Sequence, residues 1–401
     1  FYLFTYFRMR LMSMAPSSPS VLMVANWDWV LYNFRLALAS TLREEGYRVT
    51  FVCPDGKYVS ELRQAGFPWI KWPLDRRSLN PLTELRALWR LAQIYEQAQP
   101  DLVHHDTIKP NVYGALATWL NEKRGVTDVR PQVINSFMGI GFLFSDRPLA
   151  RWLRPVVLPL MRFGMRKGHI YTTFSNQGDR ETFIRQRLVR LDRSHVIVSE
   201  FVDVDRFRPA SKTGVSDHEP VRVLMAARLL WDKGVKEFVE AARLLGQRNI
   251  SVEFLLAGEP DTSTPGFVPE EKLKEWHESG VIRWLGHRSD MPDLLRQVDI
   301  AVLPTHYNEG LPRFLVEAAA TGLPLVATNI DACRQIVDED ENGYLIPKQD
   351  ARQLAQVVED LVQHPERRER LGRNSRERAE TDFAEHIVVE EWLDLYEKRL
   401  F

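Results

Sequence analysis

Short apolar runs alternate with amphipathic helical patterns along almost the whole chain. In the first half, helical patterns such as 33–45 and 82–98 separate runs that are long enough for buried strands. Alternation of this kind is typical of parallel sheets covered by helices. We expect strands at 21–25, 49–53, 102–104, 133–135, 170–174 and 196–198, which would make residues 21–207 one α/β domain.

A polar stretch rich in Pro, Ser and Gly interrupts this pattern at 208–220 and is predicted to be a linker. The alternation resumes over 221–381, with strands expected at 221–226, 252–257, 282–285, 300–304, 325–327 and 344–346. Two Rossmann-like parallel-sheet domains that meet at a cleft follow from the two sets. Residues 382–401 are expected to form a C-terminal helix, since one helical face carries Val389, Trp392, Leu393 and Tyr396.

Composition narrows the class of protein. The 401 residues are 44% hydrophobic with a net charge of −1, which provides for sizeable cores and does not favour nucleic acid as a partner. Cys53 and Cys333 are the only cysteines, which fits a reducing, cytoplasmic compartment and excludes a thiolate metal site. No apolar run reaches the roughly 18–20 residues of a membrane span. Residues 1–20 fit either an over-extended translation start or a weak interfacial tether.

The most informative loop follows the strand predicted at 300–304. Gly310 allows close approach of a ligand, and a helix is expected to begin at Pro312, so the N–H groups of Gly310 and Leu311 can bind an anion. Glu309 stands just before this helix and Glu317 inside it. Two carboxylates flanking an anion site suit a nucleotide-sugar, although a helix cap at Glu309 and a solvated Glu317 would also explain the pair.

The stretch NEGLPRFLVEAAATGLPLVAT, followed by CRQIV and ENGYLIP, resembles the donor-site signature of family 4 glycosyltransferases. The resemblance extends over about 21–395. It implies a GT-B fold, in which the last helix crosses back onto the first domain, and transfer with retention at the anomeric carbon. It also implies that Glu309 contacts the hydroxyls of the transferred sugar and that Glu317 contacts the ribose.

Two loops of the second domain carry further donor-site candidates. ARLLWDKG resembles the diphosphate-binding segment of the family, which makes Arg228 and Lys233 the cations that neutralise the leaving group. WLGHRSDM follows the strand predicted at 282–285, where family members bind the nucleotide base. His287 and Arg288 are therefore candidates for the base pocket, and ordinary turn residues are an equal alternative.

The first domain offers weaker signals. HHDTIKPNVYG resembles a family loop that borders the acceptor or the donor sugar; adjacent histidines alternate faces, so one at most enters the cleft, and we favour His105. NSFMGIGFLF, with Gly139 and Gly141, resembles a loop that faces the donor phosphates. The chain departs from the family pattern at Phe201 and Ala332, where glycine is usual, and this affects the expected loop conformation more than the reaction.

No metal or other cofactor is expected. Asp203 and Asp205 form a D-x-D pair, but they lie at the domain junction, far in sequence from the phosphate loops, and a hard divalent cation needs more clustered oxygen ligands. Arg228, Lys233 and the helix start at Gly310 and Leu311 would supply the positive charge instead.

A basic and apolar segment without acids follows Asp146. Its arginines occupy one arc of a helix that Pro155 and Pro159 are expected to break. The segment fits either an amphipathic surface helix or docking on anionic lipid, which would place the protein peripherally on the inner face of the plasma membrane. The arginines are Arg147, Arg151, Arg154, Arg162 and Arg166.

Together these observations predict a retaining glycosyltransferase. We expect it to move a hexose or N-acetylhexosamine from a nucleotide-sugar, UDP-linked, to a polyprenyl-diphosphate-linked saccharide, as in the N-acetylgalactosaminyl and hexosyl transferases of lipid-linked oligosaccharide assembly that it resembles. A nucleotide-sugar epimerase of the same fold and a non-catalytic nucleotide-sugar-binding partner of an assembly complex are the alternatives.

Overall fold

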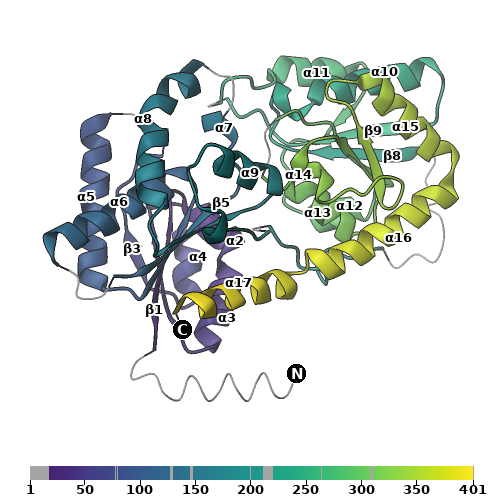
Figure 1. The fold of residues 1–401 in the computed structure, drawn as a ribbon. Coiled ribbons are helices and arrows are strands. Elements are labelled where there is room, and N and C mark those ends of the chain that lie inside the picture. The colour runs from purple at the N-terminus through teal and green to yellow at the C-terminus, as the bar shows by residue number, and fades with distance from the viewer. Residues whose placement is uncertain are drawn as a thin grey trace.

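The computed structural model describes residues 18–76, 78, 80–126, 130–144, 148–198, 200–210, 220–262, 264–307 and 310–400. Two parallel sheets, each covered by helices, form two Rossmann-like domains (Figure 1). Both strand orders reverse direction at the first strand of the domain. The sheet orders are β3-β2-β1-β4-β5-β6-β7 in the first domain and β10-β9-β8-β11-β12-β13 in the second.

The strands of the first domain are β1 (Ser20–Ala25), β2 (Arg48–Cys53), β3 (Trp69–Lys71), β4 (Leu102–Asp106), β5 (Gln132–Phe137), β6 (Ile170–Phe174) and β7 (Ser194–Val196). Its helices are α2 (Asp28–Phe34), α3 (Leu36–Glu44), α4 (Val59–Gln64), α5 (Pro81–Ala98), α6 (Ile108–Arg124), α7 (Gly141–Phe144), α8 (Pro148–Met165) and α9 (Gln177–Arg185). The 3₁₀ turn η1 (Leu191–Arg193) precedes β7. The central strands are buried on both faces because helices cover both sides of the sheet.

The strands of the second domain are β8 (Val221–Ala226), β9 (Val252–Ala257), β10 (Arg283–Trp284), β11 (Ile300–Leu303), β12 (Leu325–Thr328) and β13 (Gly343–Ile346). Its helices are η2 (Trp231–Lys233), α10 (Val235–Gln247), α11 (Glu270–Glu278), α12 (Met291–Leu295), α13 (Arg313–Ala320), α14 (Asp331–Arg334), α15 (Ala351–Gln363) and α16 (Pro365–Asp382). One continuous core joins β8, β9, β11 and β12 to helices α10, α13 and α15.

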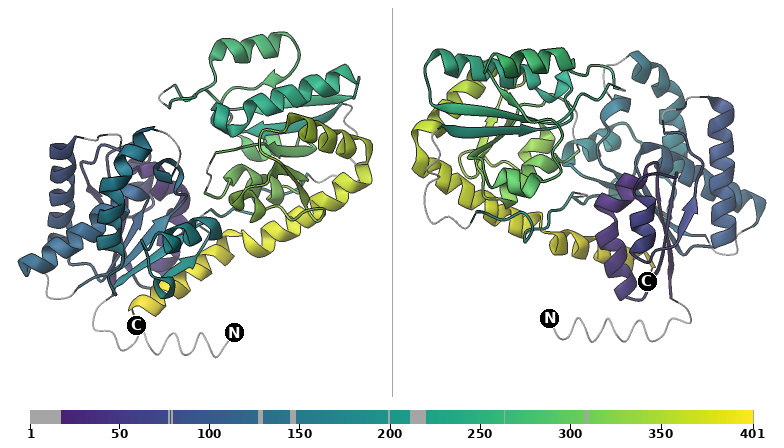
Figure 2. Two further views of the ribbon diagram at one scale, coloured as in Figure 1. Left: turned by 45° about the horizontal axis from the view of Figure 1, so that its top comes forward. Right: turned by 180° about the vertical axis from the view of Figure 1, so that it is seen from behind.

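The C-terminal helix α17 (Glu385–Leu400) returns to the first domain, as the resemblance implies. In Figures 1 and 2, α16 follows the second domain and α17 continues from it under the first domain. The side chains of Val388, Trp392 and Tyr396 are buried in the same core as β1, β2 and α3. The chain therefore ties the two domains together twice, at 200–210 and at the α16–α17 junction.

Several predicted elements differ from the structure for local reasons. The helix expected at 33–45 is two helices, because Arg35 between them turns a buried side chain toward Asp106. β7 lies two residues before the predicted strand, and β3 was not predicted because three half-exposed residues give too little pattern. Pro312 is the residue before α13 rather than its first residue.

Candidate active site

The loops after β8 and β11 lie side by side at the carboxyl edge of the second sheet, where open α/β sheets bind ligands. Gly234 has φ of 84°, and a side chain there would collide with the Pro304 carbonyl oxygen. Only glycine fits where the two loops come this close. The backbone N–H of Tyr307 donates to the Asp232 carbonyl oxygen over 3.0 Å, which fastens the two loops together.

Lys233 lies where these two loops meet, next to Gly234. Its ammonium nitrogen is 5.2 Å from the centroid of the Tyr307 ring, a cation–π distance. The Lys233 side chain therefore lies between the loop after β8 and the loop after β11. The structure places the predicted diphosphate cation beside the loop that leads to Gly310.

Arg228 lines an open cavity of about 380 Å³ together with His287 and Arg288. Its Nη1 lies 3.1 Å from Asp261 Oδ2, and the arginine remains more than half exposed. The Nε atom of Arg288 donates to Asp290 over 2.7 Å. The three side chains, predicted on two separate loops, therefore gather at one pocket.

Glu317 is buried in the first turns of α13. Burial raises the pKa of its carboxyl group, and the guanidinium of Arg313 acts in the opposite direction, with Nε 2.8 Å from Glu317 Oε1. Arg313 Nη1 also donates to Asn33 Oδ1 in α2 of the first domain over 3.3 Å. The alternative of a solvated Glu317 is therefore wrong, because the carboxylate is enclosed and paired.

The other glutamate of the predicted pair, Glu309, lies outside the described residues. Its neighbour Gly310 packs against the first domain so closely that a side chain would collide with the Met138 carbonyl oxygen. Leu311 is buried, and its backbone N–H lies at the carboxyl group of Glu200. One of the two N–H groups predicted to bind a ligand anion therefore faces a carboxyl group of the protein itself. These contacts place the start of α13 at the junction of the domains.

The loop with Gly139 and Gly141 lies against that junction. Gly139 has φ of 118°, a conformation that favours glycine. The next residue, Ile140, donates its backbone N–H to Asp179 Oδ2 over 3.2 Å. The glycine loop predicted to face the donor phosphates is thus held next to Gly310 by α9.

Two family models cover most of the chain. "Glycosyl transferase 4-like domain" matches residues 34–198, and "Glycosyl transferases group 1" matches residues 208–378. The chain belongs to the family 4 glycosyltransferases. The prediction of family and enzyme class is confirmed, and the protein is a transferase.

Curated relatives match this glycosyltransferase over most of their length. An N,N'-diacetylbacillosaminyl-diphospho-undecaprenol alpha-1,3-N-acetylgalactosaminyltransferase from Campylobacter jejuni is 28% identical over 92% of this chain and 96% of its own. A UDP-Gal:alpha-D-GlcNAc-diphosphoundecaprenol alpha-1,3-galactosyltransferase from Escherichia coli is 23% identical over 80% and 82%.

Solved structures share the fold. Anabaena HepE, crystallised in complex with UDP-glucose, superposes with a TM-score of 0.72 over 94% of this chain and 99% of its own at 19% identity. The predicted GT-B architecture of the glycosyltransferase is confirmed by this likeness and by the two sheets described above.

The orientation predicted for His105 is wrong. Its ring is fully buried, with Tyr95 Oη 2.6 Å from Nε2 and Asn135 Oδ1 2.8 Å from Nδ1, so both ring nitrogens are used inside the first domain. Burial lowers the pKa of His105 to about 4. The neutral ring faces α5 rather than the cleft, which argues against a catalytic role.

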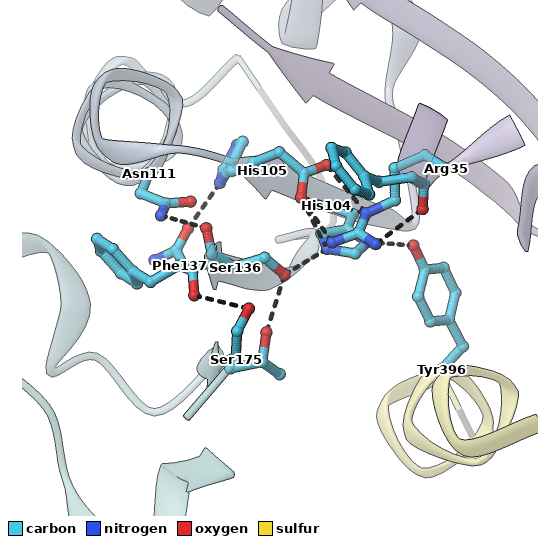
Figure 3. A network of polar contacts seen from close by, with 12 residues as sticks. Arg35, His104, His105, Asn111, Ser136, Phe137, Ser175 and Tyr396 are labelled. Carbon is cyan, nitrogen blue, oxygen red and sulfur yellow. Dashed lines mark hydrogen bonds and ion pairs between the residues drawn. The ribbon is translucent and has the colours of Figure 1, made fainter. Parts of the chain in front are cut away.

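The adjacent His104 faces the opposite side of the sheet. Its Nδ1 is 2.7 Å from the Tyr396 hydroxyl of α17, and its Nε2 is 2.6 Å from Ser136 Oγ. Beside it, Arg35 forms a buried ion pair with Asp106 at 2.7 Å (Figure 3). The histidine motif therefore builds a polar core that fixes the returning helix.

The basic segment forms helix α8, which differs from the predicted broken helix with one arc of arginines. It runs through both prolines, and its exposed face carries a stripe of large apolar side chains, with Trp152 84% exposed. Arg154 turns away from this face and donates from Nε to the Leu143 carbonyl oxygen over 2.7 Å; Arg147 lies outside the described residues. Arg151, Arg162 and Arg166 lie along one side of the stripe, and Arg162 Nη2 donates to the Gln186 carbonyl oxygen over 2.9 Å. The stripe consists of Leu149, Trp152, Val156, Leu160 and Phe163.

Asp203 has a structural task. Its Oδ1 accepts the backbone N–H groups of Asp205 and Arg206 at 3.0 and 2.9 Å, an Asx turn at the end of the first domain. Within the described part of the chain, no three His, Cys, Asp or Glu side chains gather as metal ligands would. Nor does this part contain a helix of the length and apolarity that crossing a membrane requires.

Sequence reasoning missed two side chains at the domain junction, Arg313 and Glu200. Arg313 stands four residues before Glu317, a spacing that brings side chains together on a helix and could have been noticed. Glu200 precedes the unusual Phe201, but only the fold shows that its carboxylate is buried near Leu311.

Proposed function

We propose that this glycosyltransferase moves a sugar from a UDP-sugar to a polyprenyl-diphosphate-linked saccharide, with retention at the anomeric carbon. The observation that carries the proposal is that Arg228 and Lys233 follow β8 and the buried Glu317 follows β11, two neighbouring parallel strands that end at one edge of the second sheet. The printed activities of the Campylobacter and Escherichia relatives, which act on diphospho-undecaprenol-linked sugars, support the acceptor class. The UDP-Gal donor of the second relative supports the nucleotide.

In the proposed reaction, negative charge develops on the diphosphate as its bond to the sugar lengthens. Arg228 and Lys233 stabilise that charge, and fixed cations stabilise the transition state more than the ground state, in which the diphosphate carries less negative charge. Glu317 accepts hydrogen bonds from the ribose, and Glu309 accepts them from the transferred sugar. The departing phosphate takes the proton of the acceptor hydroxyl on the same face of the sugar, which gives retention.

We propose further that the reaction proceeds without a metal ion. In this proposal Arg228 and Lys233 neutralise the diphosphate, and the Asp203 carboxylate accepts two hydrogen bonds from its own backbone turn. Arg228 and Lys233 would supply the positive charge that a divalent cation provides in other glycosyltransferases.

The outer face of α8 supports a peripheral position on the cytoplasmic leaflet. An exposed apolar stripe with arginines along one side is the arrangement that binds anionic lipid surfaces, since the stripe inserts and the charges attract. A lipid-linked acceptor is held at such a surface. We therefore propose that α8 docks the first domain on the membrane that contains the acceptor.

The test is a mass-spectrometric screen of UDP-sugars and other nucleotide-sugars. The acceptors are N-acetylglucosaminyl-diphosphoundecaprenol and N,N'-diacetylbacillosaminyl-diphosphoundecaprenol. We expect one donor to give an acceptor product heavier by one sugar residue. Epimerised donor without product would favour the epimerase, and binding without turnover would favour the non-catalytic partner.

A further inference from the structure

A second cavity, of about 530 Å³, lies between the two domains on the opposite side of the β11 loop from the Arg228 pocket. Its walls are α9 and the Ile140 loop of the first domain and residues 329–334 of the second. Tyr307 lines it too, so the cavity shares a side chain with the loop that holds Lys233. Its volume is within the range of about 300–1,000 Å³ that small-molecule sites occupy.

Its place follows from the order of the strands. The Arg228 pocket is formed by loops after β8, β9 and β10, whereas residues 329–334 follow β12 on the far side of β11. All these strands are parallel, so their carboxyl ends form one edge. Along that edge, a ligand that begins in the Arg228 pocket and passes Lys233 arrives next at this cavity.

The wall chemistry suits hydroxyl groups. Thr182 and Gln186 of α9 and Asn329 and Asp331 of the second domain offer a hydroxyl, two amides and a carboxylate. Arg334 is held by two of these side chains, with Nη2 2.6 Å from Asp331 Oδ1 and Nη1 2.8 Å from Asn329 Oδ1. A sugar ring needs such a mixture of donors and acceptors.

Charged side chains of both signs line the same walls. The carboxylates of Asp179 and Asp331 share the space with the ammonium group of Lys348, and Asp331 pairs with Arg334. Arg154 also lines the cavity, with its Nε engaged by the Leu143 carbonyl oxygen. Walls that combine charged donors with carboxylate acceptors can hydrogen-bond to a sugar from several sides.

We propose that this cavity binds the saccharide of the acceptor. The assignment rests on the proposed function, since it places the acceptor of that reaction. Phe144 and Arg154 belong to α7 and α8, so the inner face of α8 bounds the cavity on this side. Thr182 and Asp331 are then specificity-determining residues, one from each domain.

The test compares Thr182→Val and Asp331→Asn with the control Glu181→Gln. Both test variants keep the shape of the side chain, and Glu181 lies on the exposed side of α9. With the donor and acceptor that turn over in the mass-spectrometric screen, we expect each test variant to raise KM for the acceptor at least fivefold. The control should keep the wild-type KM, and the dissociation constant for UDP, measured by calorimetry, should be unchanged in all three.

The outcomes separate the assignment from the function on which it rests. If both test variants transfer the sugar with a wild-type KM for the acceptor, the assignment of the cavity to the acceptor is wrong, and the proposed function is unaffected. Weaker UDP binding in the test variants, in step with the rise in KM, would also overturn the assignment, because the residues would then act on the donor. If no acceptor is glycosylated, the proposed function fails and the assignment falls with it. Melting temperatures of the variants establish that they are folded.

Discussion

Glu317 and Glu309 are assigned to different parts of the proposed donor. Glu317 is buried and paired with Arg313, a fixed acceptor suited to a ribose that is bound equally in ground and transition states. Glu317→Ala should therefore weaken UDP binding by at least about tenfold, or roughly 1.4 kcal/mol. Glu309→Gln should lower kcat and leave UDP affinity nearly unchanged. Calorimetric UDP titrations and steady-state rates decide this, and equal losses of UDP affinity would refute the division of roles.

The two cations of the donor site should act mainly in the transition state. Arg228→Ala and Lys233→Ala are each expected to lower kcat/KM at least about tenfold, roughly 1.4 kcal/mol, without unfolding the protein. The exposed Lys236, three residues beyond Lys233, provides a control, and Lys236→Ala should keep wild-type kinetics. Wild-type kinetics in both site variants would remove Arg228 and Lys233 from the site.

Glu200 gives the protein a pH dependence that can be measured. Burial raises the pKa of its carboxyl group from 4.5 to about 7, and its Oε2 has no hydrogen-bond partner among the described residues. The folded state therefore holds a proton that the unfolded state has lost, and stability falls as the pH rises from 4.5 to about 7. The loss is up to about 3 kcal/mol. Glu200→Gln should raise the melting temperature at pH 8 and change it little at pH 5; the opposite order would contradict this assignment.

At the scale of elements, the prediction of membrane binding rests on α8. Arg151→Glu combined with Trp152→Ser should reduce binding to vesicles that contain phosphatidylglycerol, since it removes both a charge and the most exposed apolar side chain. Wild-type binding should weaken as salt is added. Leu191→Ser, an exposed apolar residue outside α8, is the control and should bind as wild type does. Equal partitioning of the α8 variant and the wild type would make α8 an ordinary surface helix.

Elements with strong periodicity could be predicted from the sequence, and those set by tertiary contacts could not. The strands that begin at Val221 and Val252 were predicted at their observed bounds, because each is an apolar run interrupted by a single charged residue. The division between α2 and α3 depends on the buried Arg35–Asp106 pair, which joins residues 71 positions apart. The continuity of α8 was missed because its prolines lie on the exposed side, where a lost backbone bond can be met by water.

At the scale of the molecule, the sequence predicted two domains and the loops of the donor site but not how the loops meet. Arg228, His287 and Arg288 gather as expected because parallel strands end at one edge. The contacts Gly310–Met138 and Arg313–Asn33 join the domains, and no local pattern encodes them. His105 was misplaced for a similar reason, since burial under α5 depends on the packing of the whole first domain.

The stereochemistry of the product tests the central claim most directly. The donor loops, the two cations and Glu317 are assigned here to retaining transfer without a metal ion. The measurement is the anomeric configuration of the newly formed linkage, determined by NMR on product made from an α-linked UDP-sugar in the presence of EDTA. The account predicts an α-linked product at the rate observed without chelator. A β-linked product, or loss of activity in EDTA with recovery on adding Mn²⁺ or Mg²⁺, would contradict it.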